Sequence, residues 1–486
     1  MIHFRTFRLM VLICLVGLLL NGGPEIGRCF AKAAPTRVMR YLNNGKLRVG
    51  VNLAMGGAIT HISRVGDSVN LINHFDLGRE IQMSDYSGPN PYIPPGKSIA
   101  PAWRGLGWNP IQCGDAFGHR SKVTYFHQTA SRLVVRCIPM IWPLKNSPAH
   151  CTFQCGLRLH NNAIYVRCTT ILHRTDRTQY PGRPQECPAV YTVGKYWRLM
   201  AYTGNRPFTH GPVSFLDTPA ALAREQAVFA GRLHGNPWIR FRATENWAAM
   251  VDRNGRGIGI WSPGTFEFSG GFAGTATGRG GPSDSQTGYI APNQYMILDH
   301  NIVYKYNYVL IIGSLKNIRD FVYRHAKRPR PPVWLFNQNR QGWIYQGATD
   351  TGWPLKGGLD ISLSGPHPRL LGPQMFWAAR QAPVLYMDAA FKTSRKTGRI
   401  FWRNMQQAGF AASRSIAFKI IGDGHFHRYA IRLSASAAYR GNIAQMMVMP
   451  VQTGEPEAWL KLRSIGFSPG LPAPLPGAAG TAHRPQ

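Results

Sequence analysis

Hydrophobic and polar residues alternate over short runs along most of the chain, and Gly or Pro interrupts nearly every run. This period of two predicts β-strands with one buried face, because successive side chains of a strand point to opposite sides. The pattern therefore predicts an all-β protein with many short strands. In the first part of the chain the expected strands are Leu47–Leu53, Ala58–Val65, Leu133–Met140, Ala163–Leu172, Trp247–Val251, Gly257–Trp261 and Ile302–Ile312.

Helical periodicity is rare. Pro219–Ala230 has the clearest start signal, with Thr218 as N-cap and Pro at the first helical position. Leu315–His325 and Gly372–Arg380 are the other two candidates. A chain of 486 residues with so few helices predicts two β-domains rather than one.

The domain boundary is expected at residues 326–332, a stiff, basic, Pro-rich linker. Residues 40–325 form the first domain, residues 333–467 form the second, and the Pro-, Gly- and Ala-rich tail 468–486 is expected to be disordered. The strands expected in the second domain are Val384–Phe391, Arg399–Trp402, Ser415–Ile421, His427–Leu433, Ile443–Val448 and Arg463–Phe467.

The N-terminus predicts export. Basic residues precede the apolar run Leu9–Leu20, and Ala31-Lys32-Ala33 supplies small residues at the positions that a signal peptidase reads. We expect a signal peptide over residues 1–33, a periplasmic or secreted product, and no stable membrane insertion, because the apolar run is too short.

Six cysteines follow the expected cleavage point, at Cys113, Cys137, Cys151, Cys155, Cys168 and Cys187. An oxidising compartment favours disulfides between them, although the sequence does not indicate their pairing. Their spacing matches no metal knuckle, so neither a metal nor a cofactor is expected.

The formal net charge is +34, from 56 Lys and Arg against 22 Asp and Glu. The basic residues are scattered, without the blocks or basic-aromatic motifs of a nucleic-acid module. This scattering, together with export, argues against a nucleic-acid partner, while the charge favours a polysaccharide or oligosaccharide, an anionic one included. Nothing in the sequence indicates the oligomeric state.

Two segments carry resemblances to known families. The segment Gly45–Val65, with two strands joined at Met55-Gly56-Gly57, resembles the start of galactose mutarotase-like domains. Residues 333–467 resemble the jelly-roll modules of secreted carbohydrate-active enzymes, in segments such as Arg399–Trp402 and Gly422–Tyr429. The resemblances imply a β-supersandwich followed by a β jelly roll, both acting on carbohydrate.

Candidate chemistry gathers in Thr169–Tyr191, where Glu186 stands among His, Arg and Tyr residues in a chain poor in carboxylates. Glycoside hydrolysis needs two carboxyl groups, and we take Glu186 and Glu245 as the pair, with Asp76 or Asp85 as substitute. His173 is the third catalytic candidate, as an acid. The expected substrate-binding residues are Asp76, Arg79, Tyr86, Trp108, Tyr180, Arg183, Gln185, Trp247 and His300.

Three functions remain open. Hydrolysis of glycosidic bonds is the first, and elimination on an acidic glycan by Tyr180, Arg183 and His173 is the second. The third is glycan binding without catalysis at the cell envelope. Further expectations concern Gly270–Gly288 as a loop lining a cleft and Trp353 as an aromatic that stacks on sugar. For every candidate, a buried hydrogen-bond network is the structural alternative.

Overall fold

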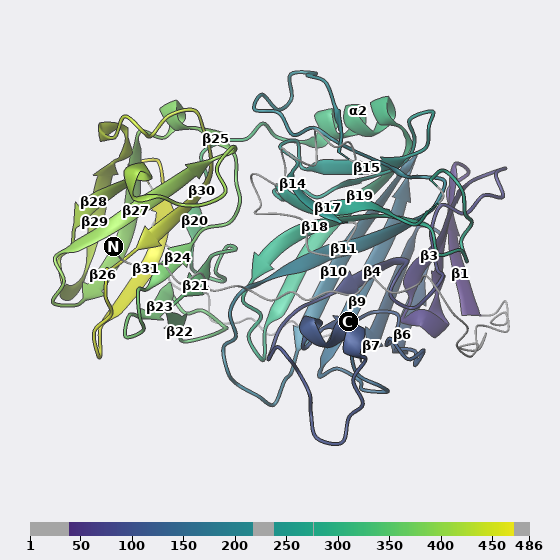
Figure 1. Ribbon diagram of the computed structural model, residues 1–486, viewed down its shortest axis with the longest axis horizontal. Helices are drawn as coiled ribbons and strands as arrows, with labels where there is room; N and C mark the ends of the chain where they lie inside the picture. The colour runs from purple at the N-terminus through teal and green to yellow at the C-terminus, as the bar shows by residue number, and fades with distance from the viewer. Residues whose placement is uncertain (1–37, 217–237, 276, 471–486) are drawn as a thin grey trace, which may run out of the picture.

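The computed structural model describes residues 38–216, 238–275 and 277–470, and it is nearly all-β, as the alternation predicts. The strands form four antiparallel sheets, arranged as two pairs. Figure 1 shows the two pairs side by side, with the first part of the chain on the right and the last part on the left.

The larger pair holds a sheet of ten strands in the order β1-β2-β3-β4-β11-β18-β17-β14, with β5 beside β4 and β8 beside β5. Its strands are β1 (Met39–Asn43), β2 (Leu47–Asn52), β3 (Ala58–Arg64), β4 (Ile81–Ser84), β5 (Pro110–Ile111), β8 (Met140–Ile141), β11 (Arg183–Val193), β14 (Ile239–Arg242), β17 (Glu267–Ala273) and β18 (Thr287–Met296).

The facing sheet has nine strands in the order β13-β12-β15-β16-β19-β10-β9-β7-β6. They are β6 (Lys122–Gln128), β7 (Arg132–Ile138), β9 (Cys151–His160), β10 (Ala163–Leu172), β12 (Arg198–Ala201), β13 (Ser214–Phe215), β15 (Trp247–Val251), β16 (Arg256–Trp261) and β19 (Val303–Ser314).

The main hydrophobic core fills the space between these two sheets. Strand β9 shows the cause, because Phe153, Cys155 and Leu157 are buried there while Gln154 and Gly156 between them are partly exposed. Strand β11 differs, since it is buried along most of its length on both faces. The outer face of β11 is therefore covered, over most of its length, by other parts of the protein.

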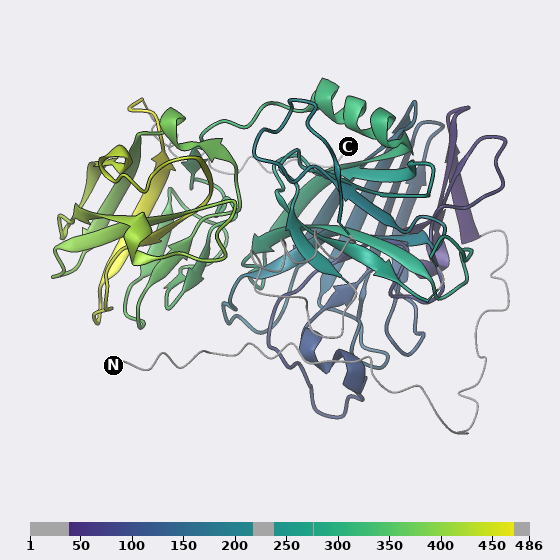
Figure 2. The same cartoon turned by 45° about the horizontal axis from the view of Figure 1, so that its top comes forward.

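Helix α2 (Leu315–His325) has the predicted bounds and ends the first domain. Ser314 accepts a hydrogen bond from the Asn317 backbone N–H, and the Asn317 side chain bonds back to the Ser314 backbone, which is a capping box. Ile318, Phe321 and Val322 bury one face of the helix against the nine-stranded sheet. Figure 2 shows α2 lying along the top edge of the larger domain.

The chain then crosses through residues 326–333 into the second pair of sheets. One sheet has the order β22-β23-β31-β26-β29 with β20 beside β31, and the other has β21-β24-β30-β27-β28 with β25 beside β30. Their strands are β20 (Trp334–Leu335), β21 (Ile344–Gln346), β22 (Thr349–Asp350), β23 (Leu359–Ser362), β24 (Arg369–Leu371), β25 (Trp377–Ala378), β26 (Val384–Lys392), β27 (Thr397–Asn404), β28 (Ser415–Lys419), β29 (Asp423–Arg432), β30 (Asn442–Met449) and β31 (Trp459–Gly466).

Some local expectations differ from the structure. The segment Gly372–Arg380 contains β25 and the start of a 3-10 turn instead of a helix, because Trp377 pairs with Ile443 of the neighbouring strand. Gly270 belongs to β17, so the expected loop is shorter and lies between β17 and β18. The expected signal peptide 1–33, the expected helix Pro219–Ala230 and the part of the expected disordered tail beyond residue 470 lie outside the described residues.

The expected disulfides are absent from the described residues, where all six cysteines are buried and unpaired. Cys155 and Cys168 come closest, with their Sγ atoms 3.1 Å apart, whereas a disulfide requires about 2.05 Å. Five of the six cysteines pack in the sandwich core as small apolar groups, and Cys113 lies in a small separate cluster with Met55 and Ala58.

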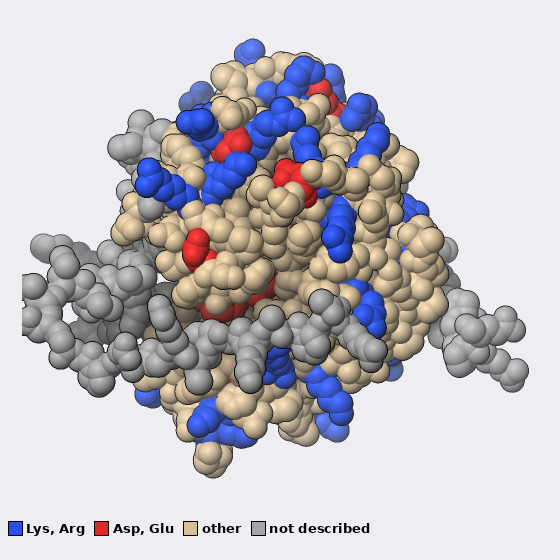
Figure 3. Space-filling model, turned by 90° about the vertical axis from the view of Figure 1, so that its right-hand side faces the viewer, with Lys and Arg blue, Asp and Glu red and all other residues tan. Residues whose placement is uncertain are grey.

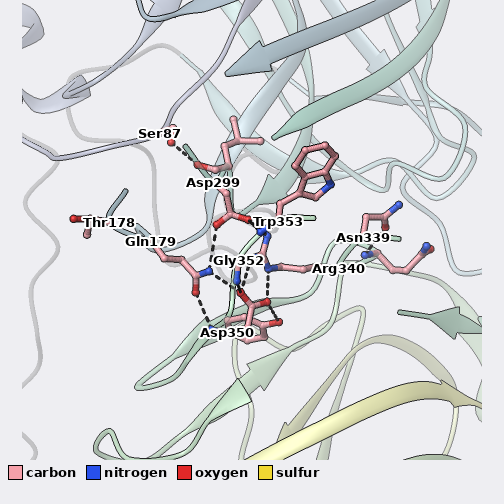
Figure 4. A network of polar contacts seen from close by, with 12 residues as sticks. Ser87, Thr178, Gln179, Asp299, Asn339, Arg340, Asp350, Gly352 and Trp353 are labelled. Carbon is pink, nitrogen blue, oxygen red and sulfur yellow. Dashed lines mark hydrogen bonds and ion pairs between the residues drawn. The ribbon is translucent and has the colours of Figure 1, made fainter. Parts of the chain in front are cut away.

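A buried charge network joins the two domains (Figure 4). The Arg340 guanidinium donates to Asp299 of the first domain at 2.7 Å and to Asp350 of its own domain at 2.6 and 2.7 Å. Gln179 of the first domain donates to both carboxylates, at 3.2 Å to Asp299 and 2.7 Å to Asp350. These contacts fix one domain against the other.

Trp353, the aromatic expected to stack on sugar, lies at the junction of the two domains. The Trp353 backbone N–H donates to Asp299 at 2.9 Å, and its ring packs partly buried against the core of the first domain. Trp343, Trp377 and Trp402 are at most 1% exposed. Trp343, Trp377 and Trp402 therefore belong to the core of the second domain, and Trp353 belongs to the domain junction.

Candidate functional site

Glu186 lies on β11 in the middle of the ten-stranded sheet, opposite Ser84 of β4 and Asn293 of β18. The strand register shifts just after Glu186, between Glu186 and Val190. Such a bulge re-aims side chains and is common beside functional sites. Cys187 faces the sandwich core, so Glu186 points to the outer face of the sheet.

Two phenols hold the Glu186 carboxyl group. Tyr86 Oη donates to Oε2 at 3.2 Å, and Tyr289 Oη donates to Oε1. Burial raises the pKa of Glu186, and the hydrogen bonds from Tyr289, Ser84 and Tyr86 act against that rise without cancelling it. The residue nevertheless keeps part of its surface exposed. Glu186 thus carries a carboxyl group that holds its proton more tightly than usual, on a residue that is not fully buried.

Tyr86 is positioned by two neighbours of Glu186 on β11. The Gln185 amide accepts from the Tyr86 backbone N–H at 2.7 Å and donates to its carbonyl at 2.9 Å. The Arg183 guanidinium lies over the Tyr86 ring, 5.0 Å from its centroid, and donates to the Leu106 carbonyl at 3.0 Å. The structure therefore brings together Tyr86, Arg183, Gln185 and Glu186, all of them predicted from sequence.

An aromatic wall stands beside the carboxyl group. Trp238 lies 4.7 Å from Tyr289 and 6.3 Å from Tyr191 between ring centroids, and Tyr191 lies 4.9 Å from Tyr289. These rings pack with Ala189 and Ala291 in a small group separate from the main core. We call Tyr86, Glu186, Tyr191, Trp238 and Tyr289 the Glu186 cluster.

Asp76 and Arg79 flank one side of the Glu186 cluster. Arg79 Nε lies 3.3 Å from Asp76 Oδ2, and the Asp76 side chain is 36% exposed. Burial is the main cause that raises the pKa of Tyr191, and the charges of Glu186, Tyr86 and Asp76 raise it further. Glu186 and Asp76 therefore lie within electrostatic reach of the same phenol.

Arg240 and Glu267 flank the other side, with Arg240 Nε 3.5 Å from Glu267 Oε1. Arg240 also donates to Tyr295. Burial is the main cause that raises the pKa of Tyr295, and the charge of Glu267 raises it further. Sequence reasoning missed these residues together with Trp238 and Tyr289. The signal was present on β18, where Tyr289, Asn293 and Tyr295 share the period of two.

Glu245 lies in the turn just before β15 of the opposite sheet, and its hydrogen bonds go to residues outside the Glu186 cluster. It accepts hydrogen bonds from Arg319, Tyr323 and the Trp247 indole, between 2.7 and 3.0 Å. Burial acts to raise the pKa of Glu245, but these hydrogen bonds outweigh it and lower the pKa. The carboxylate anchors α2 to the sheet, and Trp247, fully buried, belongs to the same anchor.

The remaining predicted residues lie apart from Glu186. His173 is exposed, and its backbone N–H donates to the His150 carbonyl at 3.0 Å. Tyr180 donates to Asp176 at 2.5 Å, and the His300 carbonyl accepts from the Arg174 N–H at 2.9 Å. Trp108 is 3% exposed and belongs to the core.

Asp85, the other substitute, is buried and faces away from the Glu186 cluster. Thr170 Oγ1 donates to its Oδ2 at 2.5 Å. Burial raises the pKa of Asp85 to about 7, and the nearby charge of Glu186 adds to the rise, while the Thr170 hydrogen bond opposes it. With no exposed surface, this group is unable to touch a substrate directly.

Outside the Glu186 cluster, surface charge, metal-ligating groups and membrane-spanning helices are the other features of the described residues that bear on function. Figure 3 shows Lys and Arg spread over one face with few acidic side chains among them. Across the described ranges, no three His, Cys, Asp or Glu side chains gather closely enough to hold a metal ion. Within the same ranges, no helix is both long and apolar enough to cross a bilayer.

No family model and no curated protein matches this sequence. Among solved structures, the chain is similar to a galactose mutarotase-like protein from Lactobacillus casei ATCC 334, at 12% identity and TM-score 0.34, over 56% of this chain and 99% of that one. A galactose mutarotase related enzyme from Lactobacillus acidophilus is similar at 10% identity and TM-score 0.32, over 57% and 97%. A low affinity xylan binding module from Roseburia intestinalis is similar at 13% identity and TM-score 0.21, over 28% and 94%. Function is therefore argued from the geometry of the site.

Proposed function

We propose that this protein binds a glycan on the outer face of the ten-stranded sheet and hydrolyses a glycosidic bond there. The observation that carries the proposal is the Glu186 carboxyl group on the outer face of the sheet, whose pKa is raised by burial although the residue keeps part of its surface exposed. A carboxyl group that stays protonated toward neutral pH is suited to protonate the leaving oxygen of a glycosidic bond.

The aromatic wall supports a saccharide ligand. Tyr191, Trp238 and Tyr289 offer flat apolar faces, and the C–H groups on one side of a pyranose ring pack well against such faces. Arg183 and Asn293 lie close by with hydrogen-bond donors for sugar hydroxyls. Apolar faces combined with a few convergent polar groups are typical of small-molecule sites.

Asp76 takes the place of Glu245 as the second carboxyl group in this proposal. Arg79 Nε lies 3.3 Å from Asp76 Oδ2, and the Asp76 side chain is exposed enough to activate a water or attack the sugar. Hydrolysis requires one carboxyl group that gives a proton and one that acts as nucleophile or base, and we assign these roles to Glu186 and Asp76. Glu245, with its hydrogen bonds to the α2 side chains, has no free oxygen for this chemistry.

Elimination is the weaker alternative because the nearby phenols hold their protons. Burial raises the pKa of Tyr86, and the charge of Glu186 raises it further. Burial and the hydrogen bond to Asp176 raise the pKa of Tyr180. A lyase requires a phenol that gives up its proton readily, so neither tyrosine suits the role of base.

The test is a panel of neutral and acidic polysaccharides incubated with the full chain, with product analysis and binding measured in parallel. We expect new reducing ends, and we expect Glu186→Gln to lower their release about 10²- to 10⁴-fold while binding persists. Asp76→Asn is expected to act likewise, whereas Asp67→Asn, an exposed carboxylate away from the site, leaves activity unchanged. Undiminished release by Glu186→Gln contradicts the proposal, and so does binding without any product from the wild-type protein. Products absorbing in the ultraviolet indicate elimination instead.

Export is the second part of the proposal, and it rests on residues 1–33. We propose that the protein acts in the periplasm or outside the cell after cleavage before Ala34. N-terminal sequencing of the protein produced in a bacterial host is expected to show Ala34 as its first residue. An uncleaved protein in the cytoplasmic fraction contradicts this placement.

A further inference from the structure

A cavity of about 550 Å³ lies between the two domains and shares no lining residue with the Glu186 cluster. The first domain contributes Asn205 and Arg206, from the loop after β12. The second domain contributes, among others, Arg380, Ser434, Arg440 and Asn442. A volume of this size is within the usual range of about 300–1,000 Å³ for ligand pockets.

Uncompensated positive charge distinguishes this cavity. Three arginines line it, and no Asp or Glu does. All three are exposed, and within the described part of the chain none of their guanidinium groups has a hydrogen bond or ion pair to another residue. By contrast, Arg319 and Arg340 are both paired with carboxylates. Three arginines around one cavity, with no acidic residue in its lining, create a positive potential that attracts an anion.

The frame of the cavity is held in place by contacts that do not use the arginine side chains. Asn442 Nδ2 donates to the Asn205 carbonyl at 2.7 Å, which ties the two domains together at the cavity rim. Asn404 Nδ2 donates to the Arg440 carbonyl at 3.0 Å. Tyr439 is 7% exposed and packs edge-on against Trp402, with ring centroids 5.1 Å apart. The backbone that carries the arginines is therefore fixed before any ligand arrives.

We propose that this cavity is a second saccharide subsite, which binds an anionic sugar through the three arginines. The shared chemistry is an oxyanion on a sugar ring, either a uronate carboxylate or a sulfate ester. Guanidinium groups bind such planar or tetrahedral oxyanions through paired N–H···O bonds. Asn205, Ser434 and Asn442 supply neutral donors and acceptors for hydroxyl groups. Only the sugar part of this ligand rests on the proposed function, because the anion is inferred from the arginines alone.

The test is calorimetric titration of the full chain at low salt with a trigalacturonate, with its neutral trigalactose counterpart, with a sulfated galactose trisaccharide and with inorganic sulfate. We expect an acidic trisaccharide to bind at least about tenfold more tightly than the neutral one, with affinity falling as salt increases. Trigalacturonate and the sulfated sugar distinguish the two sources of the oxyanion. Arg380→Gln and Arg440→Gln are each expected to weaken the tighter acidic sugar by about tenfold. Arg369→Gln and Arg432→Gln, exposed arginines outside the cavity, serve as matched controls.

Several outcomes overturn the proposal. They are equal binding of neutral and acidic sugars, unchanged affinity in both cavity variants, and inorganic sulfate binding as tightly as the sugars. Competition by single-stranded nucleic acid at equal affinity also overturns it. The variant Glu186→Gln separates this proposal from the first, because it is expected to retain acidic-sugar binding at the cavity whatever it does to catalysis. Unchanged thermal unfolding of the cavity variants establishes that they fold.

Discussion

The Glu186 carboxylate accepts a hydrogen bond from the Tyr86 phenol at 3.2 Å, although the two residues are 100 positions apart in the chain. The contact exists because β4 and β11 are neighbours in the sheet and Ser84 lies opposite Glu186. A phenol O–H stabilises the ionised carboxylate, so this pair controls the proton affinity of Glu186.

Replacing Tyr86 by Phe is expected to raise the pKa of Glu186 further, because one donor to the ionised form is lost. A hydrogen bond of about 1 kcal/mol corresponds to a rise of somewhat less than one pH unit. If Glu186 acts as the acid, activity is lost as pH rises through its pKa, and that limb moves to higher pH in Tyr86→Phe. The pH profile of kcat/KM measures it. Tyr295→Phe is the control, since this phenol contacts Arg240 rather than Glu186. A limb that moves to lower pH contradicts the assignment.

Loss of the Arg340 charge is expected to destabilise the protein. In Arg340→Met the buried carboxylates of Asp299 and Asp350 lose their common partner, which costs about 3–5 kcal/mol. Urea unfolding followed by tryptophan fluorescence is expected to show a lower midpoint, or separate transitions for the two domains. Arg369→Met, at an exposed position of the same domain, is the matched control. An unchanged midpoint shows that the network of Figure 4 does not hold the domains together.

Cys155 and Cys168 are expected to form a disulfide when the protein folds under oxidising conditions. They lie directly opposite each other on β9 and β10, and their Sγ atoms need only a small movement to bond. Burial raises the pKa of Cys168, so the folded protein reacts slowly and oxidation must occur during folding. Closing this 13-residue loop stabilises the protein by about 3 kcal/mol.

Peptide mass mapping without reductant measures this link. Protein refolded in a glutathione redox buffer is expected to give one cross-linked peptide pair, and Cys155→Ala to give none. The remaining four thiols are expected to stay free. A link between any other two cysteines, or none in the refolded wild type, contradicts the expectation.

The strands and α2 were predictable because their determinants are local. Alternation marks β9 and β10, and the apolar face of Leu315–His325 marks the helix. Glu186 was predictable for a related reason, because its helpers Arg183 and Gln185 lie on the same strand. Each of these inferences needed only residues close together in the chain.

The rest of the site depends on register between distant strands, which local patterns do not specify. Tyr289 reaches Glu186 because β11 pairs with β18, and Trp238 reaches Tyr289 across β17. Glu245 misled the prediction because a carboxylate beside a Trp has the same local sequence whether it anchors a helix or meets a substrate. Only the position of α2 distinguishes the two cases.

The buried Asp85 is expected to make stability depend on pH. Its pKa is about 7 in the folded protein, against about 3.9 in an unfolded chain. Between these two pKa values the folded state binds the proton more tightly than the unfolded chain does. The free energy of unfolding is therefore greatest at the acidic end, falls as pH rises from about 4 to about 7, and is constant above about pH 7. The full loss is about 4 kcal/mol, because each tenfold change in proton affinity corresponds to about 1.4 kcal/mol.

Asp85→Asn removes this term while keeping an acceptor for the Thr170 hydroxyl. We expect the variant to be more stable than the wild type at pH 8, by less than that full amount because its amide N–H groups need partners of their own. At pH 4 the advantage disappears. Denaturant unfolding at both pH values measures the difference between variant and wild type, and Asp67→Asn, exposed on the surface, controls for loss of one charge. If the stability difference between variant and wild type is the same at both pH values, Asp85 does not titrate in this range. Residues other than Thr170 must then compensate for its burial.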